Sequence, residues 1–170
     1  MTASPVLIRA EGPTDVAAIS AIVELAFGQP DEARLVERLR ADGDAAISLV
    51  ALIDGAVAGH VLLSPMSAPF IALGLAPVSV SPAHQRIGIG RALVETAIDR
   101  ARSDGWDAIF VLGDPAYYGR FGFRADLATG FVSPYAGPYL MVLPLGVPLP
   151  ATIGTIDYAP AFSALEPDGH

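Results

Sequence analysis

The segment 85–91, Gln-Arg-Ile-Gly-Ile-Gly-Arg, places two glycines and two arginines where a helical pattern begins. Gly88 and Gly90 lack side chains, so the backbone can approach a bulky ligand closely. The unpaired N–H groups of a first helical turn point outward, with the positive end of the helix dipole behind them. Arg86 and Arg91 add positive charge that a bound anion would balance. The segment therefore predicts a phosphate-binding turn, with a glycine-rich structural turn as the alternative.

Two common phosphate-binding motifs do not fit this turn. In the dinucleotide motif G-x-G-x-x-G the third glycine would fall at position 93, which is Leu93. A Walker A motif requires a lysine, and all 10 basic residues of this chain are arginines. The turn would therefore be a phosphate site of a kind other than these two.

The pattern Val80-x-Pro82-x-x-Gln85-Arg86-x-Gly88-x-Gly90 resembles the coenzyme A pyrophosphate loop of the GNAT superfamily of N-acetyltransferases. With residues 113–123, Gly-Asp-Pro-Ala-Tyr-Tyr-Gly-Arg-Phe-Gly-Phe, the chain resembles the YhbS-like branch of predicted acetyltransferases. The resemblance extends to about Pro144. It implies an acetyl-CoA-dependent N-acetyltransferase that acts directly on a primary amine of a small acceptor, with Gln85, Arg86, Gly88, Gly90 and Arg91 at the cofactor.

Hydrophobic periodicity positions this turn between a strand and a helix. Residues 71–80 are apolar and predict a strand that Pro82 ends, and a helix follows from the glycines to Gly105. Residues 108–112 predict a buried strand, so residues 75–80 and 108–112 would be parallel neighbours joined by a right-handed crossover. In GNAT proteins such strands splay, which implies that the pantetheine arm enters between them and bonds to the backbone near Val78 and Val80.

The other elements predict a single α/β domain with a mixed, mostly antiparallel central sheet and flanking helices. A final strand is expected at 139–143 and another beginning at Gly122-Phe123. The GNAT-like domain would span residues 1–144, and 145–170 would be a Pro/Gly-rich extension on or over it, anchored by Tyr158 and Phe162. The remaining expected elements are a strand at 6–9, helices at 14–27 and 31–39, and a hairpin of 48–53 with 56–63 around Asp54-Gly55.

Tyr118 is the residue that the resemblance most strongly implicates in chemistry. Its place in Tyr-x-x-x-Gly-Phe matches the tyrosine that serves several GNAT enzymes as general acid toward the leaving thiolate of coenzyme A. A phenol with a pKa near ~10 stays protonated at neutral pH, while a thiolate with a pKa near ~8.5 is basic enough to accept a proton. The alternative is that Tyr117, Tyr118, Phe121 and Phe123 form an aromatic packing cluster.

A general base is harder to identify. Residues 71–80 carry no carboxylate, so Asp114 is the candidate, although Asp before Pro is also a common turn residue. In GNAT folds the first two helices roof the acceptor site, so Glu24, Asp31 and Glu32 could meet an amine; carboxylates at helix ends commonly serve the helix dipole instead. His60, alone among apolar neighbours, is expected in the core, and no metal site is expected.

Composition narrows the remaining classes. With 170 residues, 52% of them hydrophobic, the chain suits one globular domain. The formal net charge of −8 argues against nucleic-acid and anionic-membrane partners, and no segment is long and apolar enough to span a bilayer. The N-terminal segment lacks the pattern of a secretory signal, which predicts a cytoplasmic protein. The apolar tail and an exposed last strand favour a homodimer.

Two other functions stay open on these residues. One is an enzyme that binds a phosphorylated substrate at the same helix N-terminus. The sequence has no carboxylate pair to hold the metal ion that such an enzyme would use, which argues against this function. The other is a non-catalytic acyl-CoA-binding module of the same fold, in which Tyr118 only packs. Turnover, and its loss on substitution of Tyr118, separates an enzyme from a binding module.

Overall fold

The computed structural model describes residues 5–146 and 148–165. Its central sheet is 6-stranded, with the order β1-β2-β3-β4-β5-β7, and a second, 2-stranded sheet pairs β6 with β8. Every neighbouring pair in the central sheet is antiparallel except β4 and β5. The strands are β1 Val6–Ala10, β2 Ile47–Ile53, β3 Ala56–Met66, β4 Ala72–Val80, β5 Ala108–Leu112, β6 Phe131–Val132, β7 Leu140–Pro144 and β8 Gly154–Thr155.

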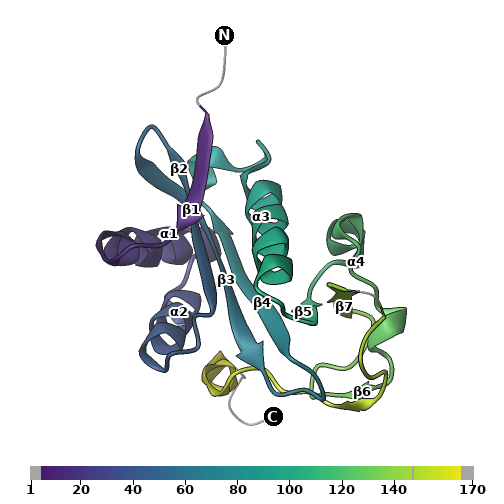
Figure 1. The fold of residues 1–170 in the computed structure, drawn as a ribbon. Coiled ribbons are helices and arrows are strands. Elements are labelled where there is room, and N and C mark those ends of the chain that lie inside the picture. Colours follow the sequence, from purple (N-terminus) through teal and green to yellow (C-terminus); the bar gives the residue numbers. More distant parts are fainter. Residues whose placement is uncertain (1–4, 147, 166–170) are drawn as a thin grey trace.

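Helices flank the sheet, so the predicted mixed, mostly antiparallel α/β fold is confirmed (Figure 1). The α-helices are α1 Val16–Phe27, α2 Asp31–Ala41, α3 Ile89–Ser103 and α4 Pro115–Tyr118. Short 3-10 turns are η1 Pro13–Asp15, η2 Pro82–His84, η3 Gly119–Phe121, η4 Asp126–Ala128 and η5 Pro160–Leu165. In the described residues no helix has both the length and the apolar character needed to cross a bilayer.

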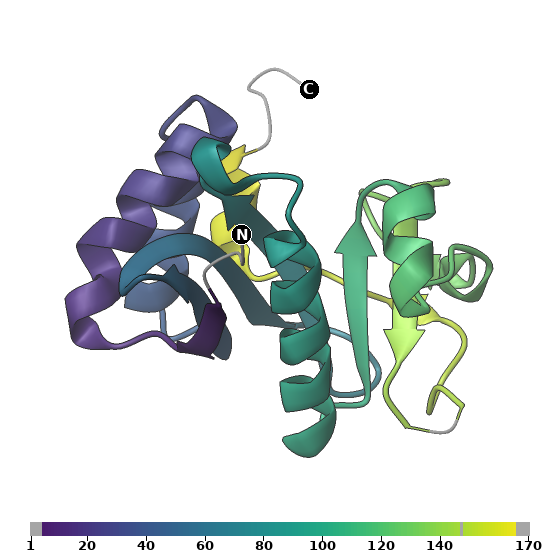
Figure 2. The ribbon, with the colours of Figure 1, turned by 90° about the horizontal axis from the view of Figure 1, so that it is seen from above.

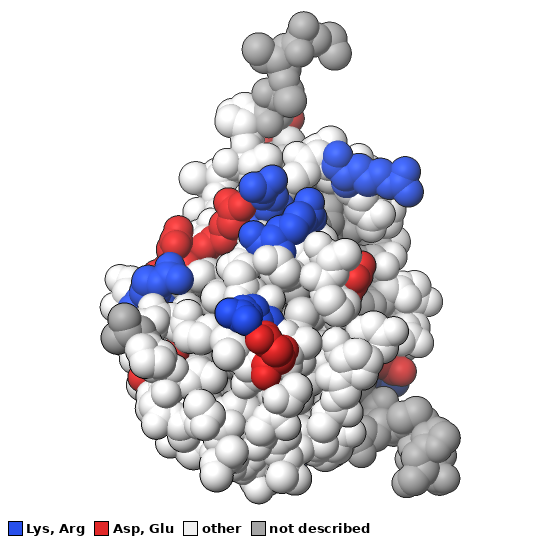
Figure 3. Space-filling view, turned by 90° about the vertical axis from the view of Figure 1, so that its right-hand side faces the viewer, with Lys and Arg blue, Asp and Glu red and all other residues white. Residues whose placement is uncertain are grey.

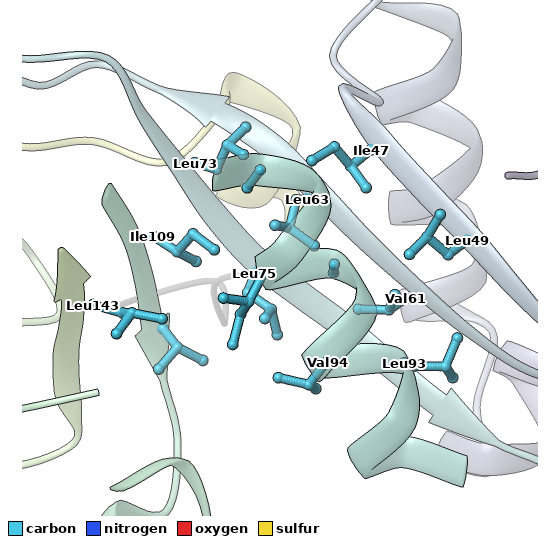
Figure 4. Close-up of a cluster of buried hydrophobic side chains, with 14 of the residues drawn as sticks. Ile47, Leu49, Val61, Leu63, Leu73, Leu75, Leu93, Val94, Ile109 and Leu143 are labelled. Atoms are coloured by element: carbon cyan, nitrogen blue, oxygen red, sulfur yellow. The ribbon is translucent and has the colours of Figure 1, made fainter. Parts of the chain in front are cut away.

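Side chains that alternate along the strands divide between the two faces of the sheet. Leu49 and Leu63 lie in the cluster that packs under α3 with Leu93 and Val94 (Figure 4). Val50 and Leu62, their neighbours in sequence, lie instead in the cluster that includes α1 and α2. The period of two along a strand therefore gives each helical layer its own core.

The segment after β7 crosses the molecule. It passes from the β6–β8 pair back to α2, where Ala161 and Phe162 are buried beside helix residues (Figure 2). Tyr158 packs against Phe162 with ring centroids 5.1 Å apart, and both residues adjoin the buried cluster of α1 and α2. Residues 166–170 of the expected extension lie outside the described part of the chain.

The parallel strands β4 and β5 pair over a short stretch only. The paired residues are Ala72, Leu73 and Gly74 with Ala108, Ile109 and Phe110. They precede the range 75–80 in which the sequence analysis expected the pairing. A register shift between β3 and β4 puts Ala76 and Pro77 opposite Leu62, and such a bulge bends a strand. The carboxyl ends of β4 and β5 therefore splay apart.

Another sequence prediction was wrong in detail. Gly122-Phe123 does not begin a strand: Gly122 has a φ of 100° and ends the η3 turn. The chain then touches the sheet through an isolated bridge between Arg124 and Val142 on β7. This bridge partly covers the edge of β7 that was expected to be exposed.

The surface charges do not form one basic patch on the face at the right of Figure 1. Figure 3 shows arginines and acidic residues interspersed there, beside a wide uncharged area. Such mixing is typical of a solvated surface.

Candidate active site

The predicted phosphate turn is the open N-terminus of α3. Gly88 is the N-cap, exposed to solvent, with a left-handed φ of 89°. A β-carbon at Gly88 would meet nothing within 4 Å, so this side of the turn is open. A β-carbon at Gly90, by contrast, would lie 3.4 Å from the Tyr117 hydroxyl. The first-turn N–H groups, together with the dipole, suit this space to an anion.

The polar residues of the turn differ in their partners. Gln85 Nε2 donates a hydrogen bond to the Val80 carbonyl at 3.2 Å, which ties the turn to the end of β4. Arg86 is exposed and holds a left-handed φ of 67°, unusual for a residue with a β-carbon. Arg91 Nε donates to Glu95 at 2.8 Å, and this exposed pair contributes little to stability. Both residues lie at the N-terminal end of α3, Arg86 just before it and Arg91 in its first turn.

The backbone of β4 presents Val78 and Val80 to the splayed edge. Ser81 N donates a hydrogen bond to Ala58 O, so the N–H and C=O groups of Ser81 point toward β3. Those of Ser79, two residues earlier on the strand, point the same way. Along a strand of an antiparallel pair this direction alternates, so Val78 and Val80 point their N–H and C=O groups away from β3. The Gln85 bond to the Val80 carbonyl agrees with that direction. Val78 and Val80 therefore offer backbone donors and acceptors along the open side of β4.

Two adjoining cavities lie along this edge. One, of about 320 Å³, runs beside the turn and is lined by Val78, Val80, Gln85, Gly90, Tyr117 and Tyr118 among others. The second, of about 480 Å³, lies beyond it and includes Leu75, Glu32, Leu112, Tyr135, Tyr158 and Phe162. Phe27, Val78 and Tyr118 line both cavities. A ligand that starts at Gly88 and follows β4 would thus reach the second cavity beside Tyr118.

Tyr118 lies at the junction of the two cavities. Its ring packs edge-on against Tyr117 and Phe123, with centroids 5.0 and 5.8 Å away, so the aromatic cluster expected as an alternative does exist. Burial, with a smaller contribution from the neighbouring Tyr117, raises the pKa of Tyr118 to about 12. Its hydroxyl is therefore a neutral hydrogen-bond donor at physiological pH.

Of the predicted carboxylates, Asp114 and Glu32 have different surroundings. Asp114 is exposed, and its side chain accepts a hydrogen bond from Ala116 N at 2.9 Å as the N-cap of α4. Glu32 is half-buried in the wall of the larger cavity and accepts from Gln29 Nε2 at 3.1 Å. Asp31 lies 4.0 Å from Arg34 on the surface of α2. Glu32 is thus the carboxylate that the fold brings to the cavity.

Sequence reasoning missed the far wall of the larger cavity. Tyr135 and Tyr158 pack edge-on at 5.6 Å, and Phe162 completes this wall. The Tyr158 hydroxyl oxygen is buried and has no hydrogen-bond partner among the described residues, and burial raises the pKa of Tyr158. The motif Asp-Tyr-Ala-Pro-Ala-Phe suggested anchors, but no sequence signal indicated that they would line a site.

His60 is fully buried in β3, as expected for a core residue. Its Nε2 lies 2.8 Å from Ser48 Oγ, and Ser48 in turn bonds to Glu11, which also accepts from Arg40. Burial lowers the pKa of His60, so the ring is neutral at pH 7. Within residues 5–146 and 148–165 the acidic and histidine side chains form no group that could hold a metal ion.

Residues 16–123 match the family described as "Acetyltransferase (GNAT) family". The uncharacterized N-acetyltransferase YhbS of Escherichia coli K12 is 40% identical over 122 residues, which cover 69% of this chain and 73% of YhbS. The uncharacterized N-acetyltransferase YjhQ of the same strain is 36% identical over 134 residues, 74% of each chain.

Two solved structures are similar to this chain over nearly its whole length. The crystal structure of YhbS from Escherichia coli in complex with CoA has a TM-score of 0.89 and 33% identity, covering 96% of this chain and 94% of that chain. A GNAT family acetyltransferase from Brucella melitensis in complex with acetyl-CoA has a TM-score of 0.79 and 34% identity, with 94% and 99% covered.

Proposed function

The chain belongs to the acetyltransferase (GNAT) family, and on that premise we propose that it transfers an acetyl group from acetyl-CoA directly to the primary amine of a small acceptor. The observation that carries this proposal is the continuous path from the open N-terminus at Gly88, along Val80 and Val78, to Tyr118 between the two cavities. Binding of CoA by the Escherichia coli relative, and of acetyl-CoA by the Brucella relative, supports the same cosubstrate here.

In this proposal the pyrophosphate binds the N–H groups that follow Gly88. Arg86 and Arg91 supply positive charge to it, and Gln85 keeps the turn attached to β4. The pantetheine arm continues the sheet by bonding to the backbone of Val78 and Val80. Its thioester then reaches the end of the smaller cavity, where Tyr118 lies.

The chemical step needs a neutral amine. Its nitrogen attacks the thioester carbonyl, the C–N bond forms, the C–S bond breaks, and the nitrogen loses a proton while the thiolate gains one. The Tyr118 hydroxyl donates a hydrogen bond to the sulfur as negative charge develops there. Since burial raises the pKa of Tyr118 to about 12, complete transfer of its proton is favourable only where the same apolar surroundings also raise the basicity of the thiolate.

A fixed base is not required for this reaction. An amine that arrives neutral reacts once it is oriented, and orientation alone can contribute several orders of magnitude. Asp114 stays a predicted base, although its carboxylate already caps α4. Glu32 is the carboxylate that shares the cavity with Tyr118.

A thermal-shift titration with acetyl-CoA, CoA, NADH and ATP tests the cofactor site, and thiol release on a panel of amines tests the reaction. Only the two coenzyme A species should raise the melting temperature. If none of the four does, the Gly88 turn is purely structural and the proposal is wrong. Binding without thiol release on any amine would favour the non-catalytic acyl-CoA-binding module instead.

A further inference from the structure

The walls of the larger cavity combine aromatic rings with one carboxylate, that of Glu32. Given the proposed function, on which this inference rests, we propose that the acceptor is an arylalkylamine: one ammonium group on a short chain, attached to an aromatic ring. Glu32 binds the ammonium group as the amine arrives, and the nitrogen then releases one proton to solvent before it attacks the thioester. The ring lies among Tyr135, Tyr158 and Phe162.

The aromatic character of the cavity is the first support. Tyr158 packs with Tyr135 at 5.6 Å and with Phe162 at 5.1 Å, so three rings form one wall. Phe27 on α1 and Leu112 on β5 are large apolar side chains that line the cavity and stay 42% and 46% exposed. Apolar surface left exposed inside a cavity is typical of a ligand site, and a planar ring would bury it.

The charge of the cavity is the second support. Among the described residues that line it, Glu32 is the one charged side chain. A second ammonium group, as in a polyamine, would be desolvated there without a partner. The carboxylate of a free amino acid would meet no cation and would repel Glu32. A single positive charge on an apolar body fits both constraints.

The accessibility of Tyr158 adds a further detail. The residue keeps some exposed surface, but its hydroxyl oxygen is buried. A ligand in the cavity therefore meets the rings of this wall and not the Tyr158 hydroxyl.

A matched set of acceptors tests this proposal by thiol release. Phenylalanine is phenethylamine with an added carboxylate, tyramine is phenethylamine with an added hydroxyl, and spermidine carries additional charges. We expect kcat/KM for phenethylamine and for tyramine to exceed that for phenylalanine and spermidine by at least about tenfold. Equal or better use of phenylalanine or spermidine would overturn the proposal.

Variants locate the effect. Glu32→Gln should raise KM for tyramine about tenfold or more, while Glu24→Gln, an exposed glutamate on α1, should not change it. An unchanged KM in Glu32→Gln would exclude Glu32 as the ammonium site.

Calorimetric titration of tyramine into the CoA-bound protein separates this proposal from the acetyltransferase reaction. Binding that weakens in Glu32→Gln, without turnover, would support the acceptor site and contradict the reaction. Turnover of other amines without binding of tyramine would support the acetyltransferase reaction and contradict the proposed acceptor.

Discussion

Gly113 lies directly against the ring of Tyr118: a β-carbon added at Gly113 would come within 2.5 Å of Tyr118 Cε2. Real β-carbons do not approach other atoms so closely, so any larger residue would displace the ring. The chain just after β5 therefore contacts the ring of Tyr118, which lies between the two cavities. Glycine at this position sets where the Tyr118 hydroxyl can be.

Gly113→Ala should therefore lower kcat while the affinity for CoA stays near that of the original protein. Displacement of a catalytic group by about 1 Å can cost about 100-fold in rate. Steady-state thiol release and CoA titration measure the two quantities. Gly119→Ala is the control, because its φ is −57° and an added β-carbon would meet nothing within 4 Å. Equal kcat in the two variants would contradict the role of this contact.

Tyr118→Phe should reduce kcat by about 10²- to 10⁴-fold without weakening CoA binding. The variant keeps the ring and its packing and removes only the hydroxyl. Tyr139→Phe, at a tyrosine that is 59% exposed, should retain full activity. A Tyr118→Phe enzyme with unchanged kcat would mean that the residue only packs.

The same hydroxyl predicts the pH dependence. Burial raises the pKa of Tyr118, so the neutral donor persists as pH increases and is lost only near pH 12. We expect kcat/KM to rise with pH as the acceptor amine loses its proton, with no decline from Tyr118 before that limit. A decline that begins near pH 9 and disappears in Tyr118→Phe would contradict the raised pKa.

Gly88→Asp should abolish CoA binding, because it adds bulk and negative charge where the pyrophosphate is expected. Gly105→Asp is a closely matched control at the other end of α3. The two glycines have φ values of 89° and 87°, and a β-carbon at either would meet nothing within 4 Å. Both variants strain the same left-handed backbone, but aspartate is favoured at a helix N-cap and disfavoured at a helix C-terminus, so Gly88→Asp should lose less stability than Gly105→Asp. Only Gly88→Asp should lose affinity in a CoA titration. Unchanged affinity in a folded Gly88→Asp protein would remove the site assignment.

Arg86→Gly should stabilise the fold slightly and weaken CoA binding. Arg86 holds a left-handed φ of 67°, which costs a residue with a β-carbon about 1 kcal/mol and costs glycine little. Keeping arginine there suggests that its charge serves the ligand. Thermal unfolding and CoA titration at two salt concentrations check both effects. Asp54→Gly, at another residue with positive φ, should leave CoA affinity unchanged.

Glu11→Gln should destabilise the fold by about 1–2 kcal/mol at pH 7. Contacts with His60, Arg40 and Ser48 hold the pKa of Glu11 below its ordinary value of 4.5. A lowered folded pKa means that this stabilisation is complete above about pH 4.5 and is lost as pH falls further. The difference in melting temperature should therefore be constant between pH 6 and 7 and shrink below pH 4.5. Asp99→Asn, in an exposed pair with Arg102, should change little.

The parts of the site that the sequence predicted are local in the chain. Gln85, Arg86 and the two glycines lie within one strand–turn–helix unit, so their spacing fixes their relative positions. Tyr118 follows β5 on a short helix that Pro115 opens, which the sequence also indicated. The Asp54-Gly55 turn likewise specified the hairpin of β2 and β3.

The larger cavity could not be predicted in this way. Glu32, Tyr135 and Tyr158 are far apart in sequence and meet only because the tail crosses back to α2. The bulge at Ala76-Pro77 also depends on pairing with β3, and it decides where β4 leaves β5.

Periodicity, turn residues and one contiguous motif thus determined the order of elements, the sheet type and the cofactor turn, because each depends on neighbours a few residues apart. The tertiary structure alone decided which carboxylate reaches the cavity, which rings line it and which hydroxyl stays unpartnered. Those features depend on long-range packing, in which distant segments compete to bury apolar surface and no local pattern records the outcome.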